Sequence, residues 1–145
     1  MNNFLSKVFS LLYPAQAQGR LQHQTTKQAM PTRVPHQANA PGDFYVEDGC
    51  CTSCNMPFTV APDLFASDPD GHCYVSKQPA DPGEVYRMVQ AFSVQEVGCI
   101  RYKGKNRVIK IQLIATGEGN QCDSLDADLK SLHQEVKADR WGLGG

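Results

Sequence analysis

The distribution of cysteines is the feature that most constrains this chain. There are six among 145 residues, and five of them lie between residues 50 and 99, whereas Cys122 stands apart. Such a concentration allows a disulfide framework, a metal or cluster site, or thiols packed in a hydrophobic core. Choosing among these requires the sequence around the cysteines.

The net charge of -1 is an average over three regions of different character. Residues 1–40 carry four basic residues and no acid, residues 41–104 carry nine acidic and four basic residues, and residues 105–145 are neutral. We therefore divide the chain into a leader (1–40), an acidic domain (41–104) and a C-terminal extension (105–145). Because the chain has no net positive charge and its acidic domain does not interleave aromatic with basic residues, nucleic-acid binding is not expected.

The leader is rich in Gln, Pro and Ala from residue 14 onward, a composition typical of disorder. Residues 4–12 have helical apolar spacing, which also suits a short helix that binds a membrane surface or a partner. Ala-Gln-Ala at 15–17 resembles a signal-peptide cleavage site, but Lys7 and Ser10 interrupt the apolar run. The favoured prediction is a disordered leader on a cytoplasmic protein without a membrane-spanning segment, whose removal leaves the domain folded.

The acidic domain alternates strand and helix signals. Strands are predicted at 44–46, 72–77 and 97–102, with at most a short helix within 58–65. A longer helix is predicted to begin at Pro82, with Asp81 as its N-cap. This order gives two βα-type halves joined by the turn at 68–71, and therefore a small α+β domain with an antiparallel sheet.

The C-terminal extension is predicted to end in an amphipathic helix. Residues 108–114 favour a strand, although an irregular helix remains open. Residues 123–139 carry an apolar stripe at helical spacing, and Gly142 follows its end. We expect this helix to cover the exposed face of the preceding sheet.

Several phrases of the acidic domain together suggest a family. The first phrase is Cys51-x-x-Cys54, which follows a short predicted strand and precedes Ala61-Pro62-Asp63-Leu64-Phe65. An Asp-Gly turn and a strand with Tyr74-Val75 come next, and the last phrase is Val97-Gly98-x-Ile100. Over residues 42–103 the chain resembles bacterial ferredoxins with a single [4Fe–4S] cluster. The resemblance implies a ferredoxin-like fold and an electron carrier rather than an enzyme. It also implies a redox partner, a reductase or an oxygenase, which would dock on the acidic domain.

The resemblance also implies a set of ligands. The first two ligand positions of the family fall on Cys51 and Cys54, whereas the third falls on Pro57 and the remote fourth on Gln95. The thiolates available to complete a [4Fe–4S] site are Cys50 and Cys99, with Cys73 as a possible substitute for one of the four.

Other interpretations of the cysteines stay open. Cys51 and Cys54 have the spacing of half a zinc site, which His72 and Cys73 could complete. Cys50 and Cys99 could form a disulfide or packed thiols, since we expect the strands that carry them to be neighbours. Cys122 is predicted to be a free thiol. A ferredoxin fold without a cluster, acting as a binding module, is a further alternative.

The remaining chemistry-bearing residues carry no signature. No nucleophile elbow, phosphate-binding loop or paired-histidine motif occurs in the chain. His23, His36 and His133 have no partner at a metal-ligand spacing, so they are assigned no function.

Overall fold

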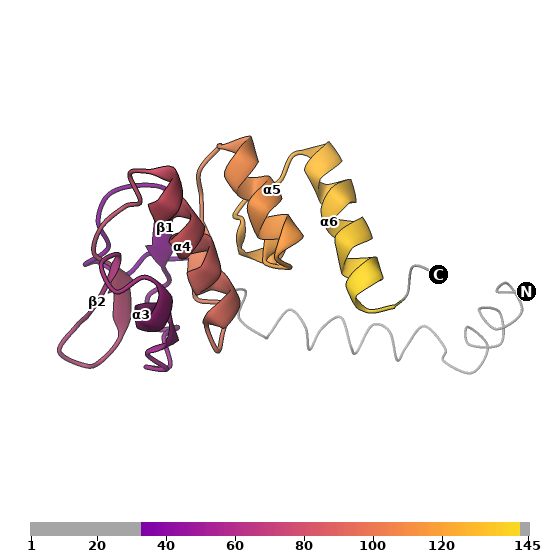
Figure 1. The fold of residues 1–145 in the computed structure, drawn as a ribbon. Helices are drawn as coiled ribbons and strands as arrows, with labels where there is room; N and C mark the ends of the chain where they lie inside the picture. The colour runs from indigo at the N-terminus through magenta and orange to yellow at the C-terminus, as the bar shows by residue number, and fades with distance from the viewer. Residues whose placement is uncertain (1–32, 143–145) are drawn as a thin grey trace, which may run out of the picture. The chain divides into compact units, whose positions relative to one another are not determined.

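The computed structural model describes residues 33–142, which lie within one compact unit (Figure 1). Predictions for residues 1–32 therefore lie outside the described residues. The elements, in chain order, are β1 (Phe44–Val46), α3 (Met56–Val60), β2 (Phe65–Ser67), β3 (Cys73–Val75), α4 (Pro82–Val94), β4 (Ile100–Tyr102), α5 (Arg107–Ala115), the 3-10 helix η1 (Gly119–Gln121) and α6 (Ala127–Arg140).

The strands form two small sheets. β1 pairs antiparallel with β4, with Phe44 opposite Tyr102 and Val46 opposite Ile100. β2 pairs antiparallel with β3. The predicted α+β class is confirmed, but the strands form two separate two-stranded sheets where one antiparallel sheet was expected.

Two side-chain amides join the sheets where no ladder does. β1 and β3 are neighbours, and Asn39 lies between them: its Oδ1 accepts from the backbone N–H groups of Val46 (3.1 Å) and Val75 (2.9 Å). Gln78 bonds both backbone groups of Phe44 through its own amide, at 3.1 and 2.8 Å. These amides satisfy strand-edge groups that would otherwise be buried without partners.

Helix α4 supplies one wall of the core. It begins as predicted, with the Asp81 carboxylate accepting from Glu84 N–H at 2.8 Å. Its buried face includes Met88, Val89 and Phe92, and the Phe92 ring meets Phe44 edge-on at 6.0 Å. The helix therefore covers the sheet formed by β1 and β4, which it contacts at β4.

Residues 107–115 form helix α5, the helical alternative for this segment. Asn106 caps the helix by accepting from Val108 N–H at 2.9 Å. Leu113 and Ile114 are fully buried, and α5 packs against α4. Tertiary burial of this face outweighs the β propensity of the segment.

Helix α6 packs against α5, so the expectation that it covers a sheet is wrong. Figure 1 shows the arrangement, in which α5 lies between α4 and α6. Leu129 of the predicted stripe is buried, and Arg107 of α5 pairs with Asp128 of α6. Gly142 follows the helix with φ 66°, as the sequence indicated.

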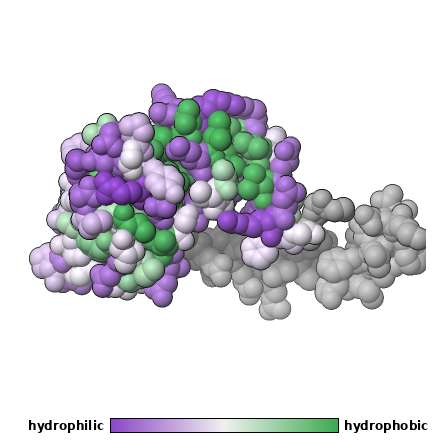
Figure 2. All heavy atoms as spheres, viewed as in Figure 1, coloured by the Kyte–Doolittle hydropathy of each residue, from purple (hydrophilic) through white to green (hydrophobic). Residues whose placement is uncertain are grey.

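Apolar side chains are also exposed on α5, where Figure 2 shows a hydrophobic area on the viewed face. Val108 and Ile111 are the large apolar side chains of this helix that remain open to solvent. Within residues 33–142, no helix is long and apolar enough to cross a membrane.

Residues 33–40, which the sequence assigned to the leader, pack on the domain. His36 is 7% exposed, its Nε2 lies 2.9 Å from Asp68 Oδ2, and its ring stacks on Tyr74. Ala40 N–H donates to the Val75 carbonyl at 2.7 Å. The polar composition of this segment did not predict these contacts, because they depend on hydrogen bonds rather than on an apolar stripe.

We expect two N-terminal truncations to differ. Removing residues 1–32 should leave the free energy of unfolding unchanged, whereas removing residues 1–40 should lower it by about 3 kcal/mol, because the buried hydrogen bonds of His36 and Asn39 are lost. Urea denaturation of the two proteins measures the difference. Equal stabilities would show that residues 33–40 contribute nothing to the fold.

Candidate functional site

Five cysteines from three segments meet at one end of the acidic domain. Cys50, Cys51 and Cys54 lie in the loop between β1 and α3, Cys73 begins β3, and Cys99 precedes β4. The pairing of β1 with β4 and the contact of β1 with β3 bring these segments together. We call these five residues the cysteine cluster; Cys122, a buried free thiol, lies outside it.

Cys50 and Cys99 are joined by a disulfide, with 5.5 Å between their Cα atoms. This was one of the alternatives for the pair, and the expected reason holds, because the residues flank the paired strands β1 and β4. The bond closes a sequence separation of 49 residues. A loop of that length corresponds to a stabilisation of about 4 kcal/mol in the chain-entropy account.

Cys51 and Cys73 form a close thiol pair. Their Sγ atoms are 3.3 Å apart, and the Cys51 thiol donates to the Cys73 sulfur. The Cys51 sulfur in turn accepts from the backbone N–H of Cys73 (3.2 Å) and of Ser53 (3.4 Å). Burial raises the pKa of the Cys73 thiol to about 12, with the hydrogen bond to Cys51 adding to the shift. Cys73 therefore holds its proton, while two backbone N–H groups converge on the Cys51 sulfur.

The loop that carries Cys51 and Cys54 has an unusual backbone. Ser53 and Asn55 both adopt left-handed conformations, with φ 59° and 61°. Non-glycine residues rarely do so, and such conformations gather at functional sites. The loop is held from both sides: Ser53 Oγ donates to the Gly71 carbonyl at 2.9 Å, and Thr52 Oγ1 donates to Glu96 at 3.2 Å.

Gln95 approaches the cluster from the end of α4. Its Oε1 accepts from the N–H groups of Cys99 (2.8 Å) and Ile100 (2.9 Å), which fixes the side chain. Its Nε2 is buried and has no hydrogen-bond partner among the described residues. The amide also lines the pocket of the cluster. A buried, unsatisfied donor at this place suits a ligand or a sulfur anion that accepts a hydrogen bond.

The pocket between the cysteines is small in this structure. It is lined by the sulfur-bearing residues Cys51, Cys54, Cys73 and Cys99, and its volume is about 10 Å³. A cavity of that size holds at most one water molecule. With the disulfide closed, the thiols of Cys51, Cys54 and Cys73 remain. A [4Fe–4S] cluster needs four ligands and far more space, so these residues do not fit it in the disulfide-bonded form.

The structure brings all the predicted site residues into one region but divides them into two pairs and a single thiol. Cys50 and Cys99 are bonded to each other, Cys51 and Cys73 are in contact, and Cys54 is half-buried nearby. Within residues 33–142, no three His, Cys, Asp or Glu side chains are arranged to hold a metal ion. The sequence did not reveal the contacts of Ser53, because they depend on backbone geometry and carry no motif.

No family model, curated protein or solved structure matches the chain, so the assignment of function depends on the site itself.

Alkylation mapping tests this arrangement. In unfolded, unreduced protein we expect modification of the four free cysteines and not of Cys50 or Cys99, which should react only after reduction. In native protein the half-buried Cys51 and Cys54 should react before the two buried free thiols. Cys73 and Cys122 should stay unmodified, since burial raises the pKa of their thiols to about 12 and 11.

Mass spectrometry of the digested protein reads out each position. Modification of Cys50 or Cys99 without reduction, or rapid labelling of native Cys73, would contradict the arrangement.

Proposed function

We propose that the chain is a small redox protein whose redox-active group is the cysteine cluster. The observation that carries the proposal is the Cys51–Cys73 thiol pair, 3.3 Å apart, beside the Cys50–Cys99 disulfide. Two thiols at this separation need little movement to form a second disulfide. The protein would thus alternate between one and two disulfides in the cluster.

The electron balance of this step is simple. The sulfurs of Cys51 and Cys73 join, and two protons and two electrons leave the thiol pair. The acceptor is a disulfide of a partner protein, which becomes two thiols. Cys51 is the attacking sulfur, because it is half-buried and accepts two backbone N–H bonds, whereas burial raises the pKa of Cys73.

The surface around the cluster suits a positively charged partner. No Lys or Arg occurs between residues 34 and 76, and the exposed acids Asp48, Asp70 and Glu96 belong to segments that adjoin the cluster. Met56 and Val97 are 41% and 43% exposed and give this surface an apolar component. We infer that a basic redox partner, such as the reductase or oxygenase that the resemblance implies, docks here through a small transient interface.

A ferredoxin-type electron carrier is the second candidate. In its favour, the elements from β1 to β4 form two β–α–β halves joined by the β2–β3 turn; the sequence predicted two βα-type halves joined at this turn, without strand β2. The N–H···S bonds to Cys51 are also of the kind that stabilise metal-bound thiolates. This candidate requires reduction of the Cys50–Cys99 disulfide, after which Cys50, Cys51, Cys54 and Cys99, or Cys73 in place of one, could supply thiolates. A bound cluster would supply one-electron transfer.

The Cys50–Cys99 disulfide, combined with the predicted cytoplasmic location, also favours a redox function. In the cytoplasm of mesophiles, disulfides are usually transient and belong to catalytic or redox-sensing cysteines. A cytoplasmic location, which the sequence predicts, therefore supports a redox function for the cluster more than a purely structural one.

Controlled oxidation tests the first candidate. In oxidised glutathione the full chain should lose two hydrogens in mass and gain a Cys51–Cys73 disulfide, mapped on digested peptides. The Cys51→Ser variant should fail to do so, while the matched Cys122→Ser variant, which removes a buried thiol outside the cluster, should behave like the wild type. Thiols at Cys51 and Cys73 that persist at every potential would exclude this candidate.

Metal analysis tests the second candidate. Protein reduced without oxygen and supplied with iron and sulfide should turn brown and hold iron and sulfide in near-equal amounts, and Cys51→Ser should abolish both. A colourless product without iron excludes a cluster. Zinc in the same sample would favour the zinc alternative, and protein without metal that also resists oxidation would favour a cluster-free binding module.

A further inference from the structure

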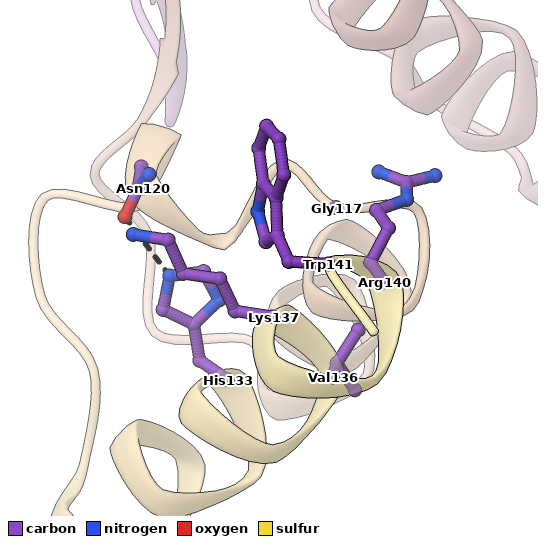
Figure 3. Close-up of a pocket in the computed structure, with 7 residues that line it drawn as sticks. All are labelled: Gly117, Asn120, His133, Val136, Lys137, Arg140 and Trp141. Atoms are coloured by element: carbon purple, nitrogen blue, oxygen red, sulfur yellow. Dashed lines mark hydrogen bonds between the residues drawn. The ribbon is translucent and has the colours of Figure 1, made fainter. Parts of the chain in front are cut away.

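A larger cavity lies away from the cysteine cluster, where the C-terminal half of α6 faces the loop after α5 (Figure 3). Its volume is about 160 Å³. Helix α6 contributes His133, Lys137 and Arg140, which lie on one face because they are four and three residues apart. The loop contributes Gly117 and Asn120 from the opposite side.

Three polar side chains of this cavity, Arg140, His133 and Asn120, are held by hydrogen bonds. Arg140 Nη1 donates to the Thr116 carbonyl at 3.0 Å, and its guanidinium lies directly against Gly117, where a Cβ would collide with it. The φ of 87° at Gly117 is a conformation that glycine adopts without strain. His133 Nε2 lies 2.9 Å from Asn120 Oδ1. A ligand would therefore meet groups that are already positioned, which reduces the entropy cost of binding.

The charge of the cavity is positive. None of the residues that line it is acidic, and neither Lys137 nor Arg140 forms an ion pair with a carboxylate of residues 33–142. Glu118 is the acid that Arg140 influences; burial raises the pKa of this carboxyl and Arg140 opposes the shift. The combined charge of Lys137 and Arg140 is larger than the partial charge of roughly -0.5 at the C-terminus of a helix such as α6. The cavity therefore keeps a net positive charge that can attract an anion.

The cavity also has an apolar, aromatic side. Val136 lines it, and Figure 3 shows the Trp141 indole standing between the side chains of Lys137 and Arg140. Trp141 is 72% exposed, which is unusual for so large an aromatic ring. A cavity of about 150 Å³ can hold one benzene ring, so a ligand here has the size of a single ring.

We propose that this cavity binds a small planar carboxylate, with its ring against Trp141 and its carboxylate at Lys137. The chemistry of the site selects both parts of the ligand: the cations require an anion, and the indole and Val136 require an apolar plane. This site does not depend on the function of the cysteine cluster.

The sole tryptophan of the chain reports on this site directly. Titrating the full chain with benzoate should give a saturable change in Trp141 fluorescence. Benzyl alcohol, a neutral molecule of similar size, should bind roughly tenfold more weakly, since it lacks charge-assisted hydrogen bonds. Backbone amide NMR signals of Gly117 and Gly119 should shift during the same titration, which places the ligand in the cavity.

Two substitutions on α6 separate the site from general charge effects. Lys137→Gln should weaken benzoate binding roughly tenfold. Lys130→Gln removes the same charge from an exposed position outside the cavity and should leave binding unchanged. Circular dichroism checks that both variants are folded. A linear fluorescence response, equal affinity for benzyl alcohol, equal effects of the two substitutions, or NMR shifts confined to the cysteine cluster would each overturn the proposal.

Discussion

The pairing of β1 with β4 is the interaction on which the rest of the structure depends. It joins segments separated by more than half of the acidic domain and sets Cys50 beside Cys99, so that the disulfide can form at its end. Short strands alone hold such a closure weakly, because each has only three residues. The disulfide and the amides of Asn39 and Gln78 compensate by fixing the loop and the neighbouring strand β3.

The same closure creates the chemical asymmetry of the cysteine cluster. Cys73 lies on the buried side of β3, where burial raises the pKa of its thiol. Cys51 lies in a loop with left-handed backbone, and its sulfur accepts one N–H group from Ser53 of that loop and one from Cys73 of β3. Neighbouring cysteines in the sequence thus have different states: Cys50 is oxidised and Cys51 is a thiol. The redox function that we propose depends on this difference, whether electrons move through thiols alone or through a cluster in the reduced protein.

The two candidate sites of the chain differ in how they are built. The cysteine cluster combines residues from three segments of the acidic domain in a pocket with room for about one water molecule. The cavity beside α6 is formed by the C-terminal extension alone, from one helix face and one loop. α5 packs against both α4 and α6, and its buried face belongs to the core of the domain. The extension is thus part of the same compact unit and carries a site of its own.

The sequence by itself determined the α+β class, the N-cap of α4, strand β1 and the region in which the cysteines gather, because these depend on local propensity and spacing. The sequence did not decide whether Cys50 and Cys99 are ligands or a disulfide, nor whether residues 108–114 form a strand or a helix. Only the tertiary structure decided these, since both depend on which surfaces meet. The tertiary structure also places α6 against α5 rather than against a sheet. It shows hydrogen-bond partners for His36 and His133 that the sequence did not predict, because hydrogen bonds between distant segments leave no periodic signal in the chain.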